Sequence, residues 1–272
     1  MRIEKVHLVY FSGTGTTQTT ARQIGSALAA GLDLPVQEID FTPAPNREPV
    51  YAFSKTDFVL FASPVYAGRI PNVLLSFVRD HIRGDHTPCA VTVLYGNRNY
   101  DSALAEWSEE LRKNRFLPIG AAAFIGEHSF SRTLGAGRPN PQDLIEAAAF
   151  GTALATKLQS SDTAPESLLP IEVPVQPYYV PRRADGTRIN ILKVKPKVSE
   201  SCTNCGTCVR LCPMGSIDPA DVSLYTGICI KCSACIKKCP AHARFFDDPD
   251  LLYHKEDLEN VCHEPKQPQT WL

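Results

Sequence analysis

The sequence predicts an α/β doubly wound parallel sheet followed by a second, small cysteine-rich unit. Three observations lead to this prediction. Strand-like and helix-like stretches alternate over residues 1–158, which is typical of a parallel sheet covered by helices on both faces. Six prolines and little periodicity mark residues 159–198 as an extended connector. Eight of the ten cysteines then fall within residues 199–245, ahead of an acidic tail at 246–272.

Periodicity predicts the elements of the first unit in chain order. VHLVYF at 6–11 and DFVLFASPVY at 57–66 are apolar runs of strand length, and the second is apolar enough to be covered on both faces. Apolar residues three or four apart predict helices. In the last of these helices, Asn140 is the expected N-cap and Pro141 the first helical residue. The other expected strands are 90–96 and 116–127, and the expected helices are 16–30, 70–82, 101–114 and 140–159, with a short helix around 250–261 before a loose end in the tail.

Length and composition limit the class of protein. At 272 residues, with 43% hydrophobic and 21% charged residues, the chain fits a soluble protein of two units. A formal net charge of -1 gives no indication of a nucleic-acid partner. The sequence shows neither a signal peptide nor an apolar window of about 20 residues, so we expect a cytoplasmic protein without a membrane span. In a reducing compartment, clustered cysteines bind metal more often than they form disulfides.

Four cysteines and a proline occur in two copies. The motifs are Cys202-x2-Cys205-x2-Cys208-x3-Cys212-Pro213 and Cys229-x2-Cys232-x2-Cys235-x3-Cys239-Pro240, and each cysteine recurs 27 residues later. Such a repeat predicts two copies of one small unit. Three thiolates two residues apart on a tight loop can reach three irons of one cubane. The fourth cysteine leads away and therefore ligates the other cluster.

This spacing predicts two [4Fe–4S] clusters rather than structural zinc. Zinc sites usually use CxxC pairs, whereas each half here has four cysteines in the same order. Residues 199–245 also resemble the bacterial two-cluster ferredoxin, a small α+β fold, and this resemblance implies one-electron transfer at low potential. The expected ligands are Cys202, Cys205, Cys208 and Cys239 for cluster 1, and Cys212, Cys229, Cys232 and Cys235 for cluster 2.

A loop rich in hydroxyl groups joins the first strand to the first helix. In YFSGTGTTQTTAR at 10–22, two glycines permit tight turns, and the backbone amides at the helix start face the loop. The loop therefore predicts a phosphate cradle that holds its anion without Lys or Arg. The loop lacks the Gly-Lys-Ser/Thr motif, so a nucleoside triphosphate site is not indicated. It also lacks G-x-G-x-x-G, so a Rossmann dinucleotide site is not indicated. The residues of this cradle are Ser12, Gly13, Thr14, Gly15, Thr16 and Thr17.

SGTGTT after the first strand resembles the FMN phosphate loop of flavodoxins, and the resemblance covers residues 1–158. It implies the flavodoxin-like strand order 2-1-3-4-5, with FMN bound beyond the carboxyl ends of the strands. It also implies that two further loops hold the isoalloxazine ring, with Tyr66 and Tyr100 stacking on it. Neither loop has the tryptophan that many flavodoxins use. The implied contacts are Ser63, Pro64, Val65, Tyr66, Ala67, Gly68, Tyr95, Gly96, Asn97, Arg98, Tyr100 and Asp101.

Nearly the whole chain resembles the flavodoxin–ferredoxin fusions of anaerobic bacteria and archaea, the EFR-type ferrodoxin family. This resemblance implies an electron carrier or a reductase. Our leading hypothesis is that low-potential electrons pass between the two [4Fe–4S] clusters and FMN, and so link a donor to an acceptor. Fusion supports it, because fusion raises the effective concentration of one redox centre near the other. A redox partner protein is expected.

Two other functions stay open at the level of the sequence. In the first, the flavin reduces a small substrate, such as a quinone, a nitro compound or a tetrapyrrole, and is supplied with electrons by the clusters. In the second, the chain is a redox docking subunit of a larger complex. The residues expected near the flavin edge that would bind a small substrate are Arg69, Arg98, His128 and Arg132. The basic residues that would steer an acidic partner are Lys231, Lys237, Lys238 and Arg244.

Overall fold

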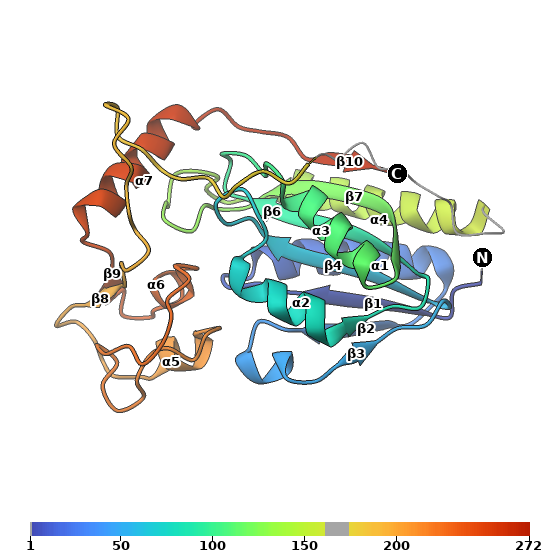
Figure 1. Cartoon of the computed structure of the whole chain (residues 1–272), viewed down its shortest axis with the longest axis horizontal. Helices are drawn as coiled ribbons and strands as arrows, with labels where there is room; N and C mark the ends of the chain where they lie inside the picture. The colour runs from blue at the N-terminus through green and yellow to red at the C-terminus, as the bar shows by residue number, and fades with distance from the viewer. Residues whose placement is uncertain (1, 161–173) are drawn as a thin grey trace.

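The computed structural model describes residues 2–160 and 174–272 (Figure 1). Residues 2–160 form the α/β unit, and residues 199–245 form the cysteine unit. Figure 1 shows the cysteine unit beyond the end of the sheet at which the parallel strands finish. This is the end of an open α/β sheet where ligands bind.

A six-stranded sheet forms the centre of the α/β unit, in the order β10-β7-β6-β4-β1-β2. Neighbouring strands are parallel except for β10, which pairs antiparallel with β7. Without β10, the strand order is 2-1-3-4-5, which confirms the predicted doubly wound sheet. The strands are β1 (Lys5–Tyr10), β2 (Val36–Asp40), β4 (Asp57–Pro64), β6 (Thr87–Tyr95), β7 (Phe116–Ile125) and β10 (Gln269–Trp271).

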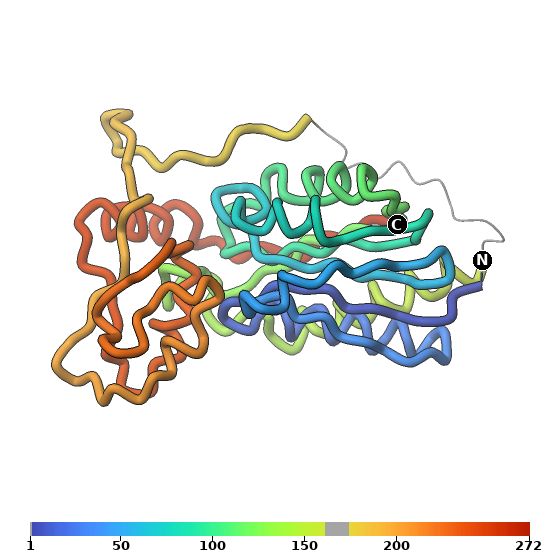
Figure 2. Tube along the Cα trace, turned by 60° about the horizontal axis from the view of Figure 1, so that its bottom comes forward, coloured from blue at the N-terminus to red at the C-terminus, as the bar shows by residue number. Residues whose placement is uncertain are grey.

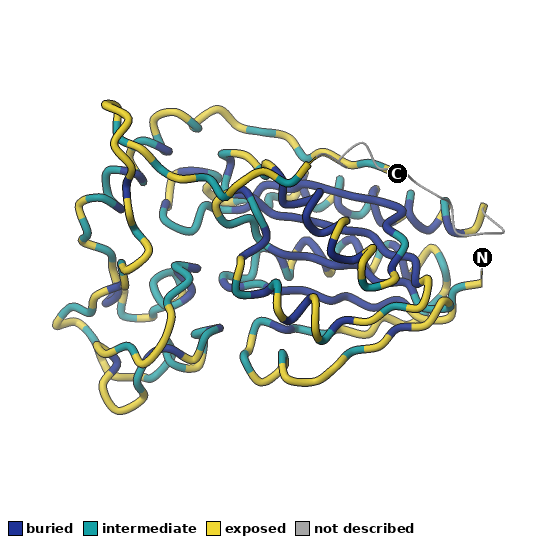
Figure 3. The backbone as a smooth tube through the Cα atoms, viewed as in Figure 1, coloured by how far each residue is buried: buried dark blue, intermediate teal, exposed yellow. Residues whose placement is uncertain are grey.

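Helices cover both faces of this sheet because its central strands are apolar on both faces. Every residue of β6 is buried, and Figure 3 shows the buried backbone concentrated in the α/β unit. One core cluster joins the sheet to α1 and α4, and the other joins it to α2 and α3. The helices are α1 (Thr16–Leu32), α2 (Leu75–His81), α3 (Ala103–Lys113) and α4 (Pro141–Ser160).

Short elements complete the α/β unit. The strands β3 (Tyr51–Ala52) and β5 (Ile82–Arg83) form a parallel pair outside the main sheet, and two 3-10 turns, η1 (Ala44–Arg47) and η2 (Asn72–Leu74), lie in the connections. Asn140 caps α4 as predicted: its Oδ1 accepts a 3.0 Å hydrogen bond from the N–H of Asp143. The Asp143 carboxylate in turn accepts from the N–H of Asn140, so the cap is reciprocal.

The cysteine unit has little regular structure. Two short helices, α5 (Thr207–Leu211) and α6 (Ala234–Lys237), each lie within one cysteine motif. The strands β8 (Lys197–Val198) and β9 (Arg244–Phe245) form an antiparallel pair that closes the unit. Among the described residues, none of the helices combines the length and the apolar character needed to cross a bilayer.

Two segments cross between the units, as Figure 2 shows. The first is the connector, of which residues 161–173 lie outside the described residues. The second is the C-terminal segment, in which α7 (Pro249–Val261) begins after Asp248, whose side chain accepts hydrogen bonds from two backbone N–H groups of the first turn. The expected helix around 250–261 is thus confirmed.

The expected loose end of the tail is wrong, because residues after α7 return to the sheet as β10. Trp271 pairs with Ala121 of β7 in an antiparallel register. An uncovered edge strand leaves a row of unpaired backbone groups, and β10 satisfies those of β7. The end of the chain is therefore part of the α/β unit, although the chain reaches it only after the cysteine unit.

Candidate functional site

The eight motif cysteines surround two cavities in the cysteine unit. The fourth cysteine of each motif lies with the first three of the other motif, so the structure brings together the two predicted ligand sets. The two cavities are similar in size, as expected when one kind of group is bound twice. The inner cavity is lined by Cys212, Cys229, Cys232 and Cys235, and the outer cavity by Cys202, Cys205, Cys208 and Cys239.

The 27-residue repeat extends to the backbone around both cavities. Asn204 and Lys231 have left-handed φ values of 51° and 55°. Gly206 and Ser233, two residues further on, have φ values of 69° and 61° and precede α5 and α6. These turns curl each CxxCxxC segment, so that successive thiols reach the same cavity. The sequence repeat therefore corresponds to a structural repeat.

Backbone amides approach the sulfur of the crossing cysteine in both copies. The N–H of Ser216 lies 3.4 Å from Sγ of Cys212, and the N–H of Ala243 lies 3.4 Å from Sγ of Cys239. Hydrogen bonds to sulfur are a normal feature of thiolate-bound clusters. Among the described residues, no three His, Cys, Asp or Glu side chains form the ligand set of a single metal ion. Four thiols around each cavity, with donors to sulfur, fit a [4Fe–4S] cluster.

The two cavities differ in exposure. Burial raises the pKa of the thiols of Cys232 and Cys235 to about 12, so these thiols stay protonated until metal displaces the proton. In the outer cavity, Cys205 is exposed, and the hydroxyl of Thr207, 3.3 Å from its Sγ, lowers the pKa of Cys205. The inner cavity is therefore the more deeply buried site.

The phosphate loop, residues 12–17, has the form of an anion cradle between β1 and α1. Gly15 precedes the helix with φ 105°, a conformation that residues with a Cβ rarely adopt. Ser12 Oγ accepts a 3.0 Å hydrogen bond from the N–H of Gln18. In the described part of the chain, the N–H groups of residues 13–17 donate no hydrogen bond. A helix start with unused donors fits the phosphate of FMN.

A lysine of the cysteine unit reaches this loop. The loop itself has no Lys or Arg. Nζ of Lys238, just after α6, lies 3.9 Å from the position that a Cβ on Gly15 would occupy. The second unit thus places a positive charge at a cradle that the first unit builds from neutral groups alone.

The second predicted flavin loop, residues 63–68, divides into two parts. Tyr66 is brought to the phosphate loop, since its hydroxyl lies 3.8 Å from the position of a Cβ on Gly13. Ser63 differs from the expectation, because it is fully buried and its Oγ accepts a 2.8 Å hydrogen bond from Nε1 of Trp107. Pro64 is the last residue of β4, and the N–H of Val65 donates to the carbonyl of Leu94, so both continue the sheet.

The rest of this loop contacts the connector and the third loop. The carbonyl of Ala67 accepts a 2.8 Å hydrogen bond from the N–H of Tyr179. A Cβ on Gly68, where φ is 78°, would lie 2.2 Å from the carboxylate of Asp101. Only glycine permits this approach, which holds the two loops together.

The third predicted loop, residues 95–101, lies against the C-terminal segment. The amide of Asn97 donates to the carbonyls of Cys262 and Glu264, and its Oδ1 accepts from the N–H of Lys266. The Tyr100 hydroxyl donates to Gln269, and its ring packs against Tyr95 and Trp271. The ring of His128 covers Gly96. The structure therefore brings Asn97 and Tyr100 to the C-terminal segment rather than to the phosphate loop.

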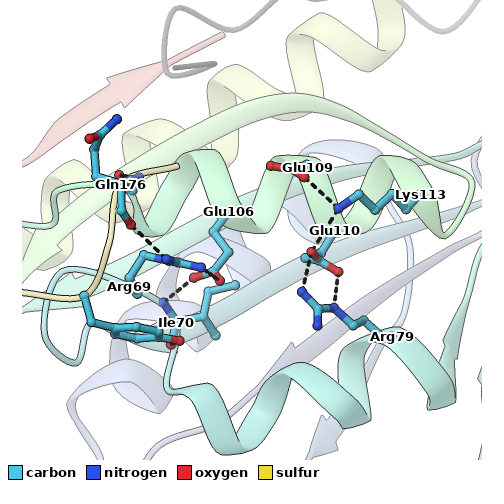
Figure 4. A network of polar contacts seen from close by, with 10 residues as sticks. Arg69, Ile70, Arg79, Glu106, Glu109, Glu110, Lys113 and Gln176 are labelled. Carbon is cyan, nitrogen blue, oxygen red and sulfur yellow. Dashed lines mark hydrogen bonds and ion pairs between the residues drawn. The ribbon is translucent and has the colours of Figure 1, made fainter. Parts of the chain in front are cut away.

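Three of the four residues considered for substrate binding have structural contacts. The Arg69 guanidinium pairs with the buried Glu106 and donates to the carbonyl of Gln176 (Figure 4). The same carboxylate accepts a 2.9 Å hydrogen bond from the N–H of Ile70. Arg98 pairs with Asp101 and lies 4.2 Å from the ring centroid of Tyr179. Of the four, Arg132 is exposed.

His128, the third of the residues with structural contacts, is held neutral. Burial, together with the charges of Lys237, His254 and Arg98, lowers the pKa of His128 to about 3, against an opposing effect of Glu259. An unfolded histidine has a pKa of about 6.5. In the unfolded chain, the His128 imidazole therefore binds a proton below about pH 6.5. In the folded chain, it binds this proton only near pH 3. The stability from this group is complete above pH 6.5 and is lost as the pH falls.

We expect this effect to be measurable with His128→Asn, which keeps an acceptor near the position of Nδ1. Between pH 7.5 and 5.5 the wild-type chain should lose about 1.4 kcal/mol more unfolding free energy than the variant, one pH unit of linkage below pH 6.5. Urea unfolding followed by circular dichroism at both pH values measures this difference. His86→Asn, at an exposed histidine, is the control and should match wild type. Parallel losses in wild type and His128→Asn would contradict the prediction.

The cysteine unit docks on the loops that follow the strands. A Cβ on Gly13 would lie 3.0 Å from Cβ of Cys232, so the phosphate loop and an inner-cavity ligand are in contact. Nζ of Lys237 pairs with Glu127 and donates to the carbonyl of His128 at 2.6 Å. At the opposite side, Arg47 donates to the carbonyl of Pro213 at 2.5 Å.

Lys237 and Arg244 were expected to steer an acidic partner from the surface, and for these two residues the expectation is wrong. The Lys237 side chain is 9% exposed, and Arg244 is 3% exposed. Arg47 was not considered at all. A sequence shows which side chains are charged. Whether such a side chain is exposed to water depends on which distant segments pack against it. The sequence signal for the burial of Arg244 is the 27-residue repeat, in which the equivalent position is an apolar residue, Ile217.

Comparison with known families finds matches in both parts of the chain. Residues 7–114 match the flavodoxin domain family, and residues 196–218 and 226–243 each match a 4Fe-4S binding domain family. These matches and the strand order confirm the flavodoxin-like fold, followed by two ferredoxin-type segments. A flavodoxin domain implies FMN, and two 4Fe-4S domains imply two clusters, so the predicted cofactors are confirmed at this level. No curated protein matches the sequence.

Solved structures with similar backbones include several flavodoxins. A flavodoxin from the domain Archaea is 17% identical, over 57% of this chain and 99% of its own, with a TM-score of 0.39. Oxidised Flavodoxin 2 from Bacillus cereus is 19% identical, over 56% and 99%, with a TM-score of 0.41. The Flv1 flavodiiron core from Synechocystis is 18% identical, over 58% and 36%, also with a TM-score of 0.41.

Proposed function

We propose that this iron–sulfur flavoprotein, a flavodoxin domain followed by two 4Fe-4S domains, relays low-potential electrons in a fixed order. The order is an external partner protein, the outer cluster, the inner cluster and FMN, in either direction. The outer and inner clusters are those held by the cysteines of the outer and inner cavities. The observation that carries this proposal is the contact between Cys232 of the inner cavity and Gly13 of the phosphate loop.

Exposure supports the order of the centres. Cys232 is 8% exposed and lies against the α/β unit, so an outside protein cannot reach the inner cluster at this ligand. Cys205 of the outer cavity is exposed. A partner that docks at the surface therefore meets the outer cluster first. The inner cluster stands between it and the flavin.

Residues of this chain would bind and orient the centres. The unused N–H groups of residues 13–17 would hold the FMN phosphate, and Lys238 would add a positive charge. The Tyr66 hydroxyl and the Cys232 side chain both approach Gly13, and Tyr66 would help to exclude water there. FMN supplies exchange of one or two electrons, whereas each cluster supplies one. The protein therefore contributes distance, orientation and burial rather than bond chemistry.

Stopped-flow reduction of the anaerobic, fully loaded protein tests this proposal. Less than one equivalent of a small low-potential reductant is mixed with the protein, and the cluster and flavin absorbances are followed. We expect the flavin to be reduced in a first-order phase whose rate constant does not change over a hundredfold range of protein concentration. A rate constant that rises in proportion to protein concentration would show transfer between molecules and contradict the proposal.

The carrier is favoured here over an enzyme acting on a small substrate. In the described structure, Arg69 and Arg98 pair with carboxylates, and His128 is held neutral, so these groups are committed to structural contacts. The cysteine unit also covers the strand ends where a substrate would approach the flavin. Turnover of a quinone, a nitro compound or a tetrapyrrole at the flavin, without any partner protein, would favour the enzyme instead.

A further inference from the structure

One side chain departs from the symmetry of the cysteine unit. Arg244 of β9 lines the outer cavity. The residue 27 positions earlier is Ile217, which lines the inner cavity and is 2% exposed. The repeat therefore offers an internal comparison: one cluster site has a buried isoleucine at this position, and the other has a buried arginine.

The Arg244 guanidinium lies within the cysteine unit and contacts the ligands. Nη1 lies 3.5 Å from Sγ of Cys208 and donates a 2.8 Å hydrogen bond to the carbonyl of Val222. Nη2 donates to the Tyr225 hydroxyl at 2.5 Å. In the described part of the chain, Nε is buried without a hydrogen-bond partner. This charge is thus fixed in place by three contacts, one of which is a ligand sulfur of the outer cavity.

The buried charge of Arg244 has no carboxylate partner within residues 2–160 and 174–272. Among the described residues, Arg244 forms no ion pair with Asp or Glu. A buried, unpaired charge is costly unless another charge compensates it. Burial lowers the pKa of Arg244, whereas Cys235 of the inner set and Cys208 of the outer set raise it, so thiolates of both sets are close enough to compensate the charge. A cluster held by four thiolates adds negative charge, and each electron that it accepts adds more.

We propose that Arg244 sets the reduction potential of the outer cluster above that of the inner cluster. The positive charge and the N–H donor at Cys208 stabilise the reduced, more negative cluster more than the oxidised one. At the equivalent position of the inner cavity, Ile217 offers neither. Arg244 also acts on Cys235 of the inner set, but it lines the outer cavity, where its Nη1 lies 3.5 Å from Sγ of Cys208. An electron shared between the two clusters therefore resides mainly on the outer cluster, at the exposed end where a partner docks. The reaction whose potential Arg244 sets is the one-electron reduction of the outer cluster by an external reductant. The inference rests on the two-cluster assignment of the proposed function.

Redox titration of the loaded protein, followed by EPR, tests this inference with Arg244→Met. We expect the reduction equilibrium constant of the outer cluster to fall at least tenfold, which is about 59 mV for a one-electron couple. The inner cluster should shift less. Arg244→Lys, which keeps the charge, should stay closer to wild type than Arg244→Met. A Cys212→Ser background, in which only the outer cluster is expected, assigns the signals.

If Arg244→Met retains wild-type iron but both clusters titrate within a factor of two of wild type, the inference is overturned. It is also overturned if the shift falls mainly on the inner cluster. If Arg244→Met loses iron, Arg244→Gln is compared with Arg244→Lys by the same criteria. Equilibrium titration does not depend on how fast the flavin is reduced, so failure of the relay would leave this result intact.

Discussion

A Cys212→Ser chain is expected to lose the inner cluster, although Cys212 belongs to the first motif. Its Sγ lines the inner cavity with the three thiols of the second motif and accepts from the N–H of Ser216. Loss of one ligand should remove about four irons per chain, half of the content expected for two clusters. The outer cluster should persist, but fast reduction of the flavin within the molecule should disappear. Iron analysis and the stopped-flow assay measure both effects.

The reciprocal variant, Cys239→Ser, is the matched comparison. It should lose the same amount of iron from the outer cavity while the inner cluster stays beside the phosphate loop. Reduction of the flavin by a small reductant should therefore persist, whereas transfer from a partner protein should fail. Cys262→Ser, outside both motifs, should leave the iron content unchanged. The crossing assignment is contradicted if Cys239→Ser abolishes internal flavin reduction and Cys212→Ser retains it.

The crossing arrangement stays a prediction for the clusters themselves, but the grouping of the eight thiols around two cavities could be predicted from the sequence because the relevant information is local. Each CxxCxxC segment curls through left-handed residues such as Gly206 and Ser233, and three thiols then reach one cavity by spacing alone. The fourth cysteine follows a short helix that carries it away. The strand order of the α/β unit was predictable for a similar reason, since central strands such as β6 are largely apolar and are buried throughout.

Contacts between distant segments were not predictable. Residues 269–271 are too few to show a strand period, and β10 exists only because the edge of β7 is available to it. Tyr100 and Asn97 occupy positions typical of flavin contacts, but the C-terminal segment uses both side chains. Ser63 likewise looks available in the sequence, and it is buried under Trp107. In each case a segment far along the chain determines the environment.

Lys237→Met is expected to release the cysteine unit from the α/β unit. The Lys237 side chain is 9% exposed, and its ammonium group pairs with Glu127 and donates to the carbonyls of His128 and Ser131. Its removal leaves a carboxylate and two carbonyls without this donor. Breaking a fully buried pair costs about 3–5 kcal/mol, and we expect about 2–3 kcal/mol because Glu127 keeps some access to water.

A loss of this size should make opening of the two units about 30 to 150 times more frequent, at about 1.4 kcal/mol per tenfold. Amide hydrogen exchange at residues 128–131 and 234–238 should accelerate, and flavin reduction within the molecule should slow. Lys197→Met is the control, because its ion pair with Asp247 is exposed and such pairs contribute at most about 1 kcal/mol. Unchanged exchange in Lys237→Met would show that docking depends instead on the phosphate-loop contact at Gly13 and on the return of β10 to the sheet.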